Sequence, residues 1–186
     1  MNLAFFLVSG VWIGSELLLS RLMRTRKGER GDRDERTLTV IYAATVIATT
    51  LATVIAWSSA WPIGRLAEVR YFGMLIILAG MALRIWAMAV LGRFFTYNVA
   101  LRDGHQLIRS GPYRVLRHPS YSALMLSFFG YGVALNHWLS VAVIVVPVFL
   151  AFNRRIAVEE AVLSGHFGDD YAQYKRHTWR LVPLIY

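Results

Sequence analysis

Cysteine is absent from the 186 residues of the chain. The protein therefore has no disulfide bonds, no thiolate metal site and no cysteine nucleophile. A dinucleotide-binding G-x-G-x-x-G motif after a strand is also missing. The five histidines lie in separate parts of the sequence, without the spacing of a metal site, so we expect no bound metal.

Charged residues are scarce. They make up 17% of the chain, while 56% of the residues are hydrophobic. A soluble domain is usually about 25% charged and about 45–50% apolar. The apolar residues are gathered in long blocks, so the sequence predicts a multi-pass integral membrane protein. The net charge of +9 comes from residues that flank these blocks, which favours contacts with membrane lipid head groups over nucleic acid.

Five apolar blocks predict five transmembrane helices, and we expect an all-α fold. A short polar break at 136–138 predicts that the last two helices form a tight hairpin, with a cytosolic helix and tail after residue 152. Pro147 should kink the last span. We expect a single domain over residues 1–186, with two N-terminal spans in 1–61 and a second half in 71–186. The blocks cover residues 2–19, 38–60, 71–91, 122–135 and 139–152.

Lysine and arginine alternate strongly between successive loops. Seven lie in 21–36, two follow the second span, five lie in 93–117, none lies in the hairpin, and five lie in 154–180. By the positive-inside rule the N-terminus is outside, and the basic segments and the C-terminus are cytoplasmic. Arg84 falls within the third span and should face the protein interior or reach an interface.

Two polar segments, 93–121 and 153–180, flank the predicted hairpin. A hairpin brings its two ends together, so we expect these segments to share one cytoplasmic site. Pro119 disfavours helical geometry at His118 and suits the first turn of a helix. His118 should therefore lie at the mouth of the fourth helix, where an anionic group can bind. A capped helix start with an interfacial Arg-His pair is the alternative.

Arg155 and Glu159 are four residues apart and share one helix face. Arginine offers a planar fork for a carboxylate, and glutamate can accept hydrogen bonds from an ammonium or a hydroxyl group. A surface ion pair is the alternative. Tyr171 and Tyr174 also share a face, which favours an amphipathic helix that docks on the membrane interface.

The ordered motifs resemble the isoprenylcysteine carboxyl methyltransferase family, which is part of a wider group that includes phospholipid N-methyltransferases. The resemblance covers the C-terminal half. Ala123 and Ile108 depart mildly from the family pattern, in which glycine and valine are usual. Gly130-Tyr131-Gly132 is similar to a motif of the phospholipid enzymes, although close helix packing explains it better. The matching motifs are His105-x-Leu-Ile, Gly111-x-Tyr113, Arg117-His118-Pro119-Ser120-Tyr121, Arg155-x-x-x-Glu159-Glu160, Phe167-Gly168-x-x-Tyr171-x-x-Tyr174 and Arg180-x-x-Pro183.

The resemblance implies S-adenosyl-L-methionine as the methyl donor and makes 71–186 the catalytic half. Arg155 would bind the carboxylate of a lipophilic or prenylated acceptor, and Arg155 and Glu159 would be the catalytic residues. The family match, not the spacing, favours Glu159 over Glu160. The donor-binding residues implied are Asn98, His105, Gln106, Leu107, Ile108, Tyr113, His118, Pro119, Ser120, Tyr121 and Glu159.

Three other functions stay open at this point. An amine or phospholipid acceptor would have to lose a proton, which requires a base such as Glu160 or a tyrosine. A non-enzymatic scaffold that binds anionic lipids would explain the spans and the charge. A membrane reductase with a nicotinamide cofactor is the third alternative.

Overall fold

The structure is a computed structural model, and it describes residues 3–22, 32–58, 61–97 and 104–186. This part of the chain is helical and has no strand, apart from an isolated bridge between Leu116 and Trp179. The helices are α1 (Leu3–Leu22), α2 (Asp32–Ile55), α3 (Leu66–Leu91), α4 (Pro119–Ala134), α5 (Trp138–Phe167) and α6 (Asp169–His177), with short 3-10 turns η2 (Ala56–Ser58), η3 (Gly92–Phe94) and η4 (Gly111–Arg114).

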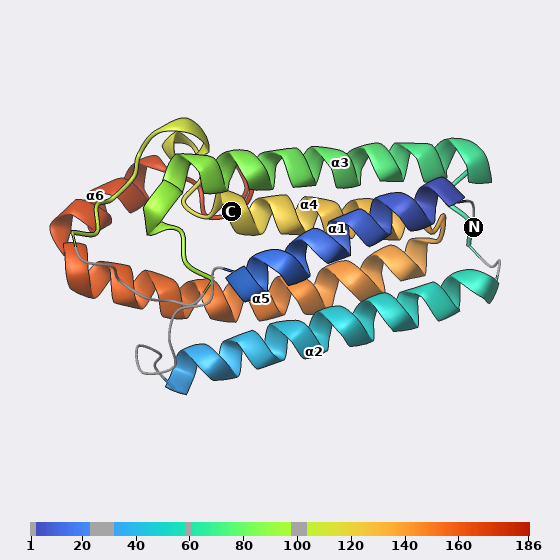
Figure 1. Ribbon diagram of the computed structural model, residues 1–186, viewed down its shortest axis with the longest axis horizontal. Helices are drawn as coiled ribbons and strands as arrows, with labels where there is room; N and C mark the ends of the chain where they lie inside the picture. The colour runs from blue at the N-terminus through green and yellow to red at the C-terminus, as the bar shows by residue number, and fades with distance from the viewer. Residues whose placement is uncertain (1–2, 23–31, 59–60, 98–103) are drawn as a thin grey trace.

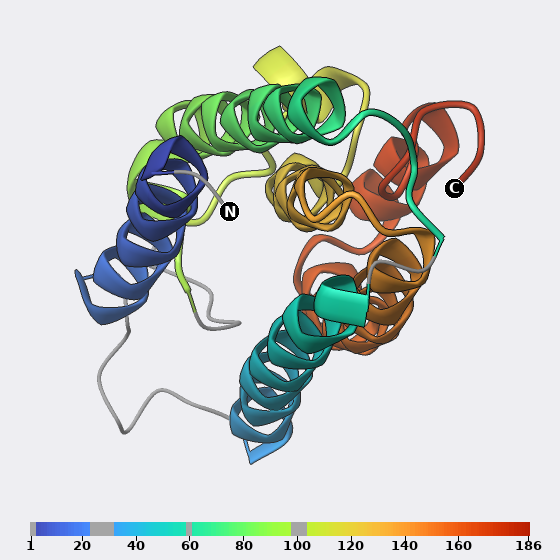
Figure 2. The same ribbon diagram turned by 90° about the vertical axis from the view of Figure 1, so that its right-hand side faces the viewer.

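Five of the helices run along the long axis of the molecule, and α6 lies at one end (Figure 1). Seen along that axis, α4 occupies the middle of the bundle (Figure 2). It packs against α3 and α5, while α2 packs on α5 and α1 lies against α3. The end of α3 and the start of α4 point towards the end of the molecule that carries α6, and α5 continues past them to reach α6 (Figure 1).

Four helices, α1, α2, α3 and α5, are long and apolar enough to cross a membrane. The predictions of an all-helical and multi-pass protein are confirmed. The central helix α4 has 16 residues, and at about 1.5 Å per residue it extends about 24 Å, less than the ~30 Å core of a bilayer. The predicted count of five spans therefore stays a prediction.

The tight hairpin is confirmed, since only residues 135–137 separate α4 from α5. Asn136 adopts a left-handed conformation with a φ of 56°. Its side-chain oxygen accepts hydrogen bonds from the backbone N–H groups of Ile63 and Gly64, each at 3.1 Å. The His137 side chain caps α5 by accepting a hydrogen bond from the Ser140 N–H group. The hairpin is thus fastened to the loop before α3.

The last predicted span and the helix predicted after residue 152 form one continuous helix. The helix α5 runs without interruption from Trp138 through Pro147 to Phe167. A 30-residue helix spans about 45 Å, so its C-terminal part extends beyond the apolar core. Asn153, Arg154 and Arg155 are compatible with a helix, and the change to polar composition at this stretch does not end it.

Glycines allow α3 and α4 to approach closely. A Cβ atom added to Gly130 would lie 2.8 Å from the Gly73 carbonyl oxygen, and one added to Gly80 would lie 2.7 Å from the Ala123 carbonyl oxygen. Such distances leave no room for a side chain. This confirms close packing as the role of Gly130 and fixes the position at which α4 enters the site.

Candidate active site

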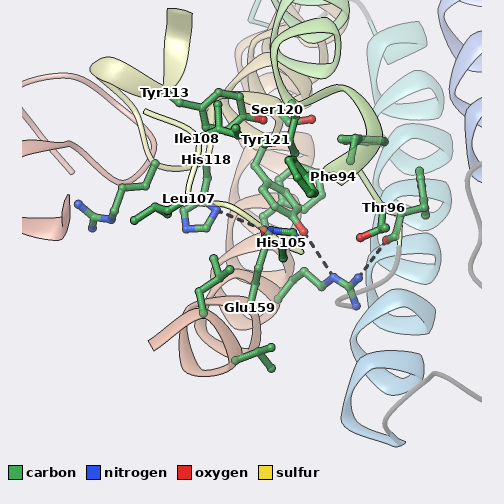
Figure 3. Close-up of a pocket in the computed structure, with 18 of the residues that line it drawn as sticks. Phe94, Thr96, His105, Leu107, Ile108, Tyr113, His118, Ser120, Tyr121 and Glu159 are labelled. Carbon is green, nitrogen blue, oxygen red and sulfur yellow. Dashed lines mark hydrogen bonds and ion pairs between the residues drawn. The ribbon is translucent and has the colours of Figure 1, made fainter. Parts of the chain in front are cut away.

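A cavity lies where the start of α4, the C-terminal part of α5, α6 and the segment after α3 meet. It has a volume of about 140 Å³ for the centres of water molecules. Since one water needs roughly 10–15 Å³ on this measure, the cavity offers room on the order of ten waters. Side chains of His118, Tyr121 and Glu159 point into the same space (Figure 3).

All but two of the predicted site residues line this cavity. Pro119 is instead buried as the first residue of α4, where it shapes the helix start. Asn98 lies outside the described residues. The residues that do line the cavity are His105, Gln106, Leu107, Ile108, Tyr113, His118, Ser120, Tyr121, Arg155 and Glu159.

The segment that leads into α4 is held by the C-terminal tail. The Arg117 N–H group donates to the Trp179 carbonyl oxygen at 2.7 Å, and the His118 N–H group donates to the Arg180 carbonyl oxygen at 3.2 Å. His118 is the N-cap residue of α4, as the His-Pro sequence predicts. The position of His118 is therefore fixed by α4, which it begins, and by the hydrogen bonds to the tail.

The imidazole of His118 lies between two carboxylates. Its Nε2 atom is 3.1 Å from Glu160 Oε1, and its Nδ1 atom is 3.9 Å from Glu159 Oε1. The side chain is 3% exposed. The buried imidazole is thus within hydrogen-bond distance of Glu160 and lies next to the Glu159 carboxylate, beyond hydrogen-bond distance.

The neighbouring Glu160 faces away from the cavity and has a different environment. Its carboxylate pairs with Arg117 at 3.1 Å, with Lys175 at 3.4 Å and with Arg180 at 3.5 Å, in addition to His118. These partners belong to the start of α4, to α6 and to the tail. Glu160 therefore ties three segments together, whereas Glu159 is the glutamate that lines the cavity.

Arg155 is buried, with 1% exposure, and joins three parts of the bundle. Its Nε atom donates to the Tyr121 hydroxyl at 3.4 Å, Nη1 to the Thr37 hydroxyl at 3.0 Å, and Nη2 to the Tyr97 carbonyl oxygen at 3.0 Å. The guanidinium group is thus held in one orientation at the cavity wall. The expectation that it shares this wall with Glu159 agrees with the structure.

The tyrosine face of α6 packs against protein rather than against the membrane interface. Tyr171 and Tyr174 are buried and line the cavity. The Tyr174 hydroxyl donates to the Tyr113 carbonyl oxygen at 2.7 Å. The spacing of the two tyrosines indicated one helix face correctly, but spacing alone could not distinguish a protein surface from a lipid surface.

These tyrosines stay protonated. Burial, followed by the charge of Glu159, raises the pKa of Tyr113. Burial also raises the pKa of Tyr171, and that of Tyr174 to about 12. The hydroxyls act as hydrogen-bond donors near neutral pH and not as bases. The Tyr171 hydroxyl is buried and has no hydrogen-bond partner within the described ranges.

Several lining residues escaped the sequence prediction. They are Arg84 of α3, the aromatic and polar residues of 94–97, and Leu38 and Ile41 of α2. Arg84 faces the interior, as expected, where it pairs with Glu16 of α1. Glu16 and Arg84 are charged residues of opposite sign in two different apolar blocks. This was the sequence signal that could have predicted a contact between α1 and the site.

A family model described as phospholipid methyltransferase matches residues 69–170 of the chain. The chain belongs to this family. The matched range begins in α3 and ends in α6, so it contains α4, α5 and nearly the whole cavity wall. Leu38 and Ile41 of α2 lie outside it.

Curated relatives of the chain carry names that agree with the motifs. A probable protein-S-isoprenylcysteine O-methyltransferase of Oryza sativa subsp. japonica is 33% identical over 119 residues, covering 63% of this chain and 62% of that protein. Protein-S-isoprenylcysteine O-methyltransferase B of Arabidopsis thaliana is 34% identical over 116 residues, covering 61% and 59%. The chain thus spans about three fifths of the length of these relatives.

A solved structure shares the fold. It is the eukaryotic intramembrane Ras methyltransferase, an isoprenylcysteine carboxyl methyltransferase. The match has a TM-score of 0.62 and 23% identity, and it covers 80% of this chain and 52% of that one. The similarity to this solved structure therefore covers more of the chain than the range that the family model matches.

Proposed function

We propose that the protein is an S-adenosyl-L-methionine-dependent methyltransferase that forms a methyl ester on the carboxylate of a lipophilic acceptor, such as a prenylated cysteine. The observation that carries the proposal is that His118, Arg155 and Glu159, which come from separate motifs, line one cavity. The names of the relatives support the same reaction. The charge pattern of the loops supports a cytoplasmic site.

The cavity wall fits the methyl donor. The unpartnered Tyr171 hydroxyl and the Glu159 carboxylate offer a donor and an acceptor for ribose hydroxyls or for the ammonium group. The rings of Phe94 and His105, 5.0 Å apart, offer an apolar face for adenine. His105 to Ile108, Tyr113, His118, Ser120 and Tyr121 would complete the donor site, with Asn98 as a further contact, and Pro119 would contribute through the start of α4.

The acceptor side of the cavity combines a cation with apolar walls. Arg155 lines the same cavity as Leu38 and Ile41 of α2 and as Leu124 and Phe152 of the hairpin. A lipid tail can pack on these side chains while the guanidinium group orients the carboxylate. The membrane then supplies the acceptor and the cytosol supplies the donor.

Positioning carries the chemistry in this proposal. S-adenosyl-L-methionine supplies a methyl group on a positively charged sulfur. A carboxylate is already ionised near neutral pH, so the protein needs no general base. Arg155 holds the attacking oxygen in line, and Glu159 and the aromatic walls stabilise the cationic part of the donor.

The test is transfer of radiolabelled methyl from S-adenosyl-L-methionine, with purified protein in detergent or nanodiscs, into prenylcysteines, fatty acids and aminolipids. We expect base-labile label in a prenylcysteine or another lipophilic acid. Calorimetry with S-adenosylhomocysteine and NADPH completes the test. Binding of NADPH alone would favour a reductase, and binding of neither would favour a lipid-binding scaffold.

Methylation of an amine or a phospholipid is the second candidate, which the description of the family favours. Three arginines, Arg84, Arg117 and Arg155, line the cavity, while among the described lining residues Glu159 is the only carboxylate. Two of these arginines are paired with carboxylates that do not line the cavity, Arg84 with Glu16 and Arg117 with Glu160, so the pH profile of the reaction is the measurement that separates the two candidates. A rate that rises with pH as the amine loses its proton would support the amine, and a flat profile would support the carboxylate.

A further inference from the structure

Arg84 of α3 and Glu16 of α1 form a buried ion pair within the apolar part of the bundle. Arg84 Nε lies 2.8 Å from Glu16 Oε1, and Arg84 Nη2 lies 2.9 Å from Glu16 Oε2. The side chains are 8% and 19% exposed. Two parallel contacts of this kind fix the plane of the guanidinium group as well as its position.

The third nitrogen of Arg84 is directed at the candidate active site. Its Nη1 atom donates to the Ser120 hydroxyl and contacts the Ser120 carbonyl oxygen at 3.4 Å. Both Arg84 and Ser120 line the cavity. Ser120 lies in the first turn of α4, two residues after His118, so the contact reaches the helix start that carries the site.

The geometry makes Ser120 dependent on Glu16. Because Glu16 holds Nε and Nη2, the planar fork can direct only Nη1 towards α4. Without the carboxylate, a buried cation would turn towards other acceptors or towards water in the cavity. The Ser120 hydroxyl would then lose its fixed donor.

We infer that Glu16 is a positioning residue for the methyl-donor site, acting through Arg84 on Ser120 and the first turn of α4. This inference rests on the proposed function. It assigns a role in donor binding to α1, which lies outside the matched range of 69–170. The first span would then be part of the site and not only a membrane anchor.

A double-mutant cycle tests the inference, with the affinity for S-adenosylhomocysteine as the readout. We expect Glu16→Gln and Ser120→Ala each to weaken binding about tenfold, and the double variant to be little weaker than Ser120→Ala, because coupled residues are not additive. Glu16→Gln should also raise the KM for the donor and leave the KM for the acceptor unchanged. Arg84→Lys, which keeps the charge but not the fork, should behave like Glu16→Gln.

Glu68→Gln is the matched control, since Glu68 makes only an exposed pair with Arg65 at 3.7 Å; its donor affinity should equal that of the unchanged protein. Additive effects in the cycle, or unchanged donor affinity in Glu16→Gln, would overturn the inference. If Glu16→Gln does not fold, Arg84→Lys takes its place in the cycle. A failure of the unchanged protein to bind S-adenosylhomocysteine would instead count against the proposed function.

Discussion

Glu159 and Glu160 are neighbours in the chain, yet their carboxylates have different surroundings. Successive residues on a helix point about 100° apart, so one glutamate faces the cavity and the other faces the tail. Glu160 meets four basic side chains, whereas Glu159 lies 3.9 Å from a single imidazole nitrogen. The difference supports the proposed roles, with Glu159 in the chemistry and Glu160 in the structure, a choice that the spacing of the two residues left open.

Replacing Arg155 tests the acceptor side of the site. We expect Arg155→Ala to lower turnover about 100-fold or more, because a fixed cation beside the reacting group is lost. Binding of S-adenosylhomocysteine, measured by calorimetry, should survive. Arg154→Ala is the matched control, since Arg154 is exposed on the same helix. Equal loss of turnover and donor binding would remove Arg155 from the acceptor role.

The raised pKa of Tyr174 predicts how the stability of the protein depends on pH. Burial raises its pKa from 10.0 to about 12, and its hydroxyl donates to the Tyr113 carbonyl oxygen. A pKa raised by folding means that this stabilisation is complete below pH 10 and is lost as the pH rises through about 12. Tyr174→Phe should cost about 1 kcal/mol at neutral pH and reduce the alkaline loss. Thermal unfolding from pH 7 to 12 measures both effects. An unchanged alkaline slope would contradict the prediction.

At the residue scale, local motifs predicted the residues that line the site, but they did not predict the distant residues that hold those side chains in place. The His118-Pro119 pair fixed a helix start, and the spacing of Arg155 and Glu159 fixed a shared face; both agree with the structure. The partners of Arg155, namely Thr37, Tyr97 and Tyr121, come from three separate segments. No local pattern specifies such contacts, because they depend on how the helices pack.

Among the elements, the α3–α4 interface depends on glycines. In Gly130→Ala the new methyl group would lie 2.8 Å from backbone atoms of Gly73 and Ile77. Since backbone cannot yield as a side chain can, we expect a loss of about 1–3 kcal/mol of stability. Gly10→Ala in α1 is the control, because nothing lies within 4 Å of its added Cβ atom. The measurement is the melting temperature of each variant in detergent. Equal melting temperatures for Gly130→Ala and Gly10→Ala would contradict the prediction.

The attachment of α6 and the tail depends on Glu160. In Glu160→Gln the carboxylate no longer balances Arg117, Lys175 and Arg180, and breaking a buried ion pair costs about 3–5 kcal/mol. We expect faster hydrogen exchange in 169–181, while α3 and α4 keep their protection. Asp169→Asn, on an exposed residue of α6, is the control. Uniform loss of protection across all helices would show that Glu160 stabilises the whole bundle instead.

The predicted elements were correct where the apolar pattern has one interpretation. The three-residue polar break at 136–138 predicted the hairpin, and the structure places the connection at 135–137, within one residue of the prediction. The last span and the cytosolic helix were predicted as separate segments, whereas the structure joins them in the single helix α5. Composition reports the surroundings of a helix, whereas its length depends on backbone geometry, and the two differ where a helix leaves the membrane.

For the whole molecule, the charge alternation predicts which end faces the cytoplasm. The absence of cysteine makes this simple to test, since a single introduced thiol has no background. Ala67 in the first turn of α3 and Gln173 in α6 are both exposed and lie at opposite ends of the bundle (Figure 1). In intact cells, an impermeant maleimide should label Ala67→Cys and spare Gln173→Cys until the membrane is opened. The reverse pattern would invert the proposed topology.

The uninterrupted helix α5 has a consequence for the choice of acceptor. Phe152, in the hydrophobic core, and Arg155, the residue proposed to hold the acceptor carboxylate, lie on the same rigid helix, and three residues of helix separate them by about 4.5 Å. In the proposed function, the helix therefore sets the distance between the apolar chain and the acid group of a bound acceptor. We expect acceptors whose acid group lies close to their apolar chain to be methylated, and those with a longer polar spacer to be poor substrates.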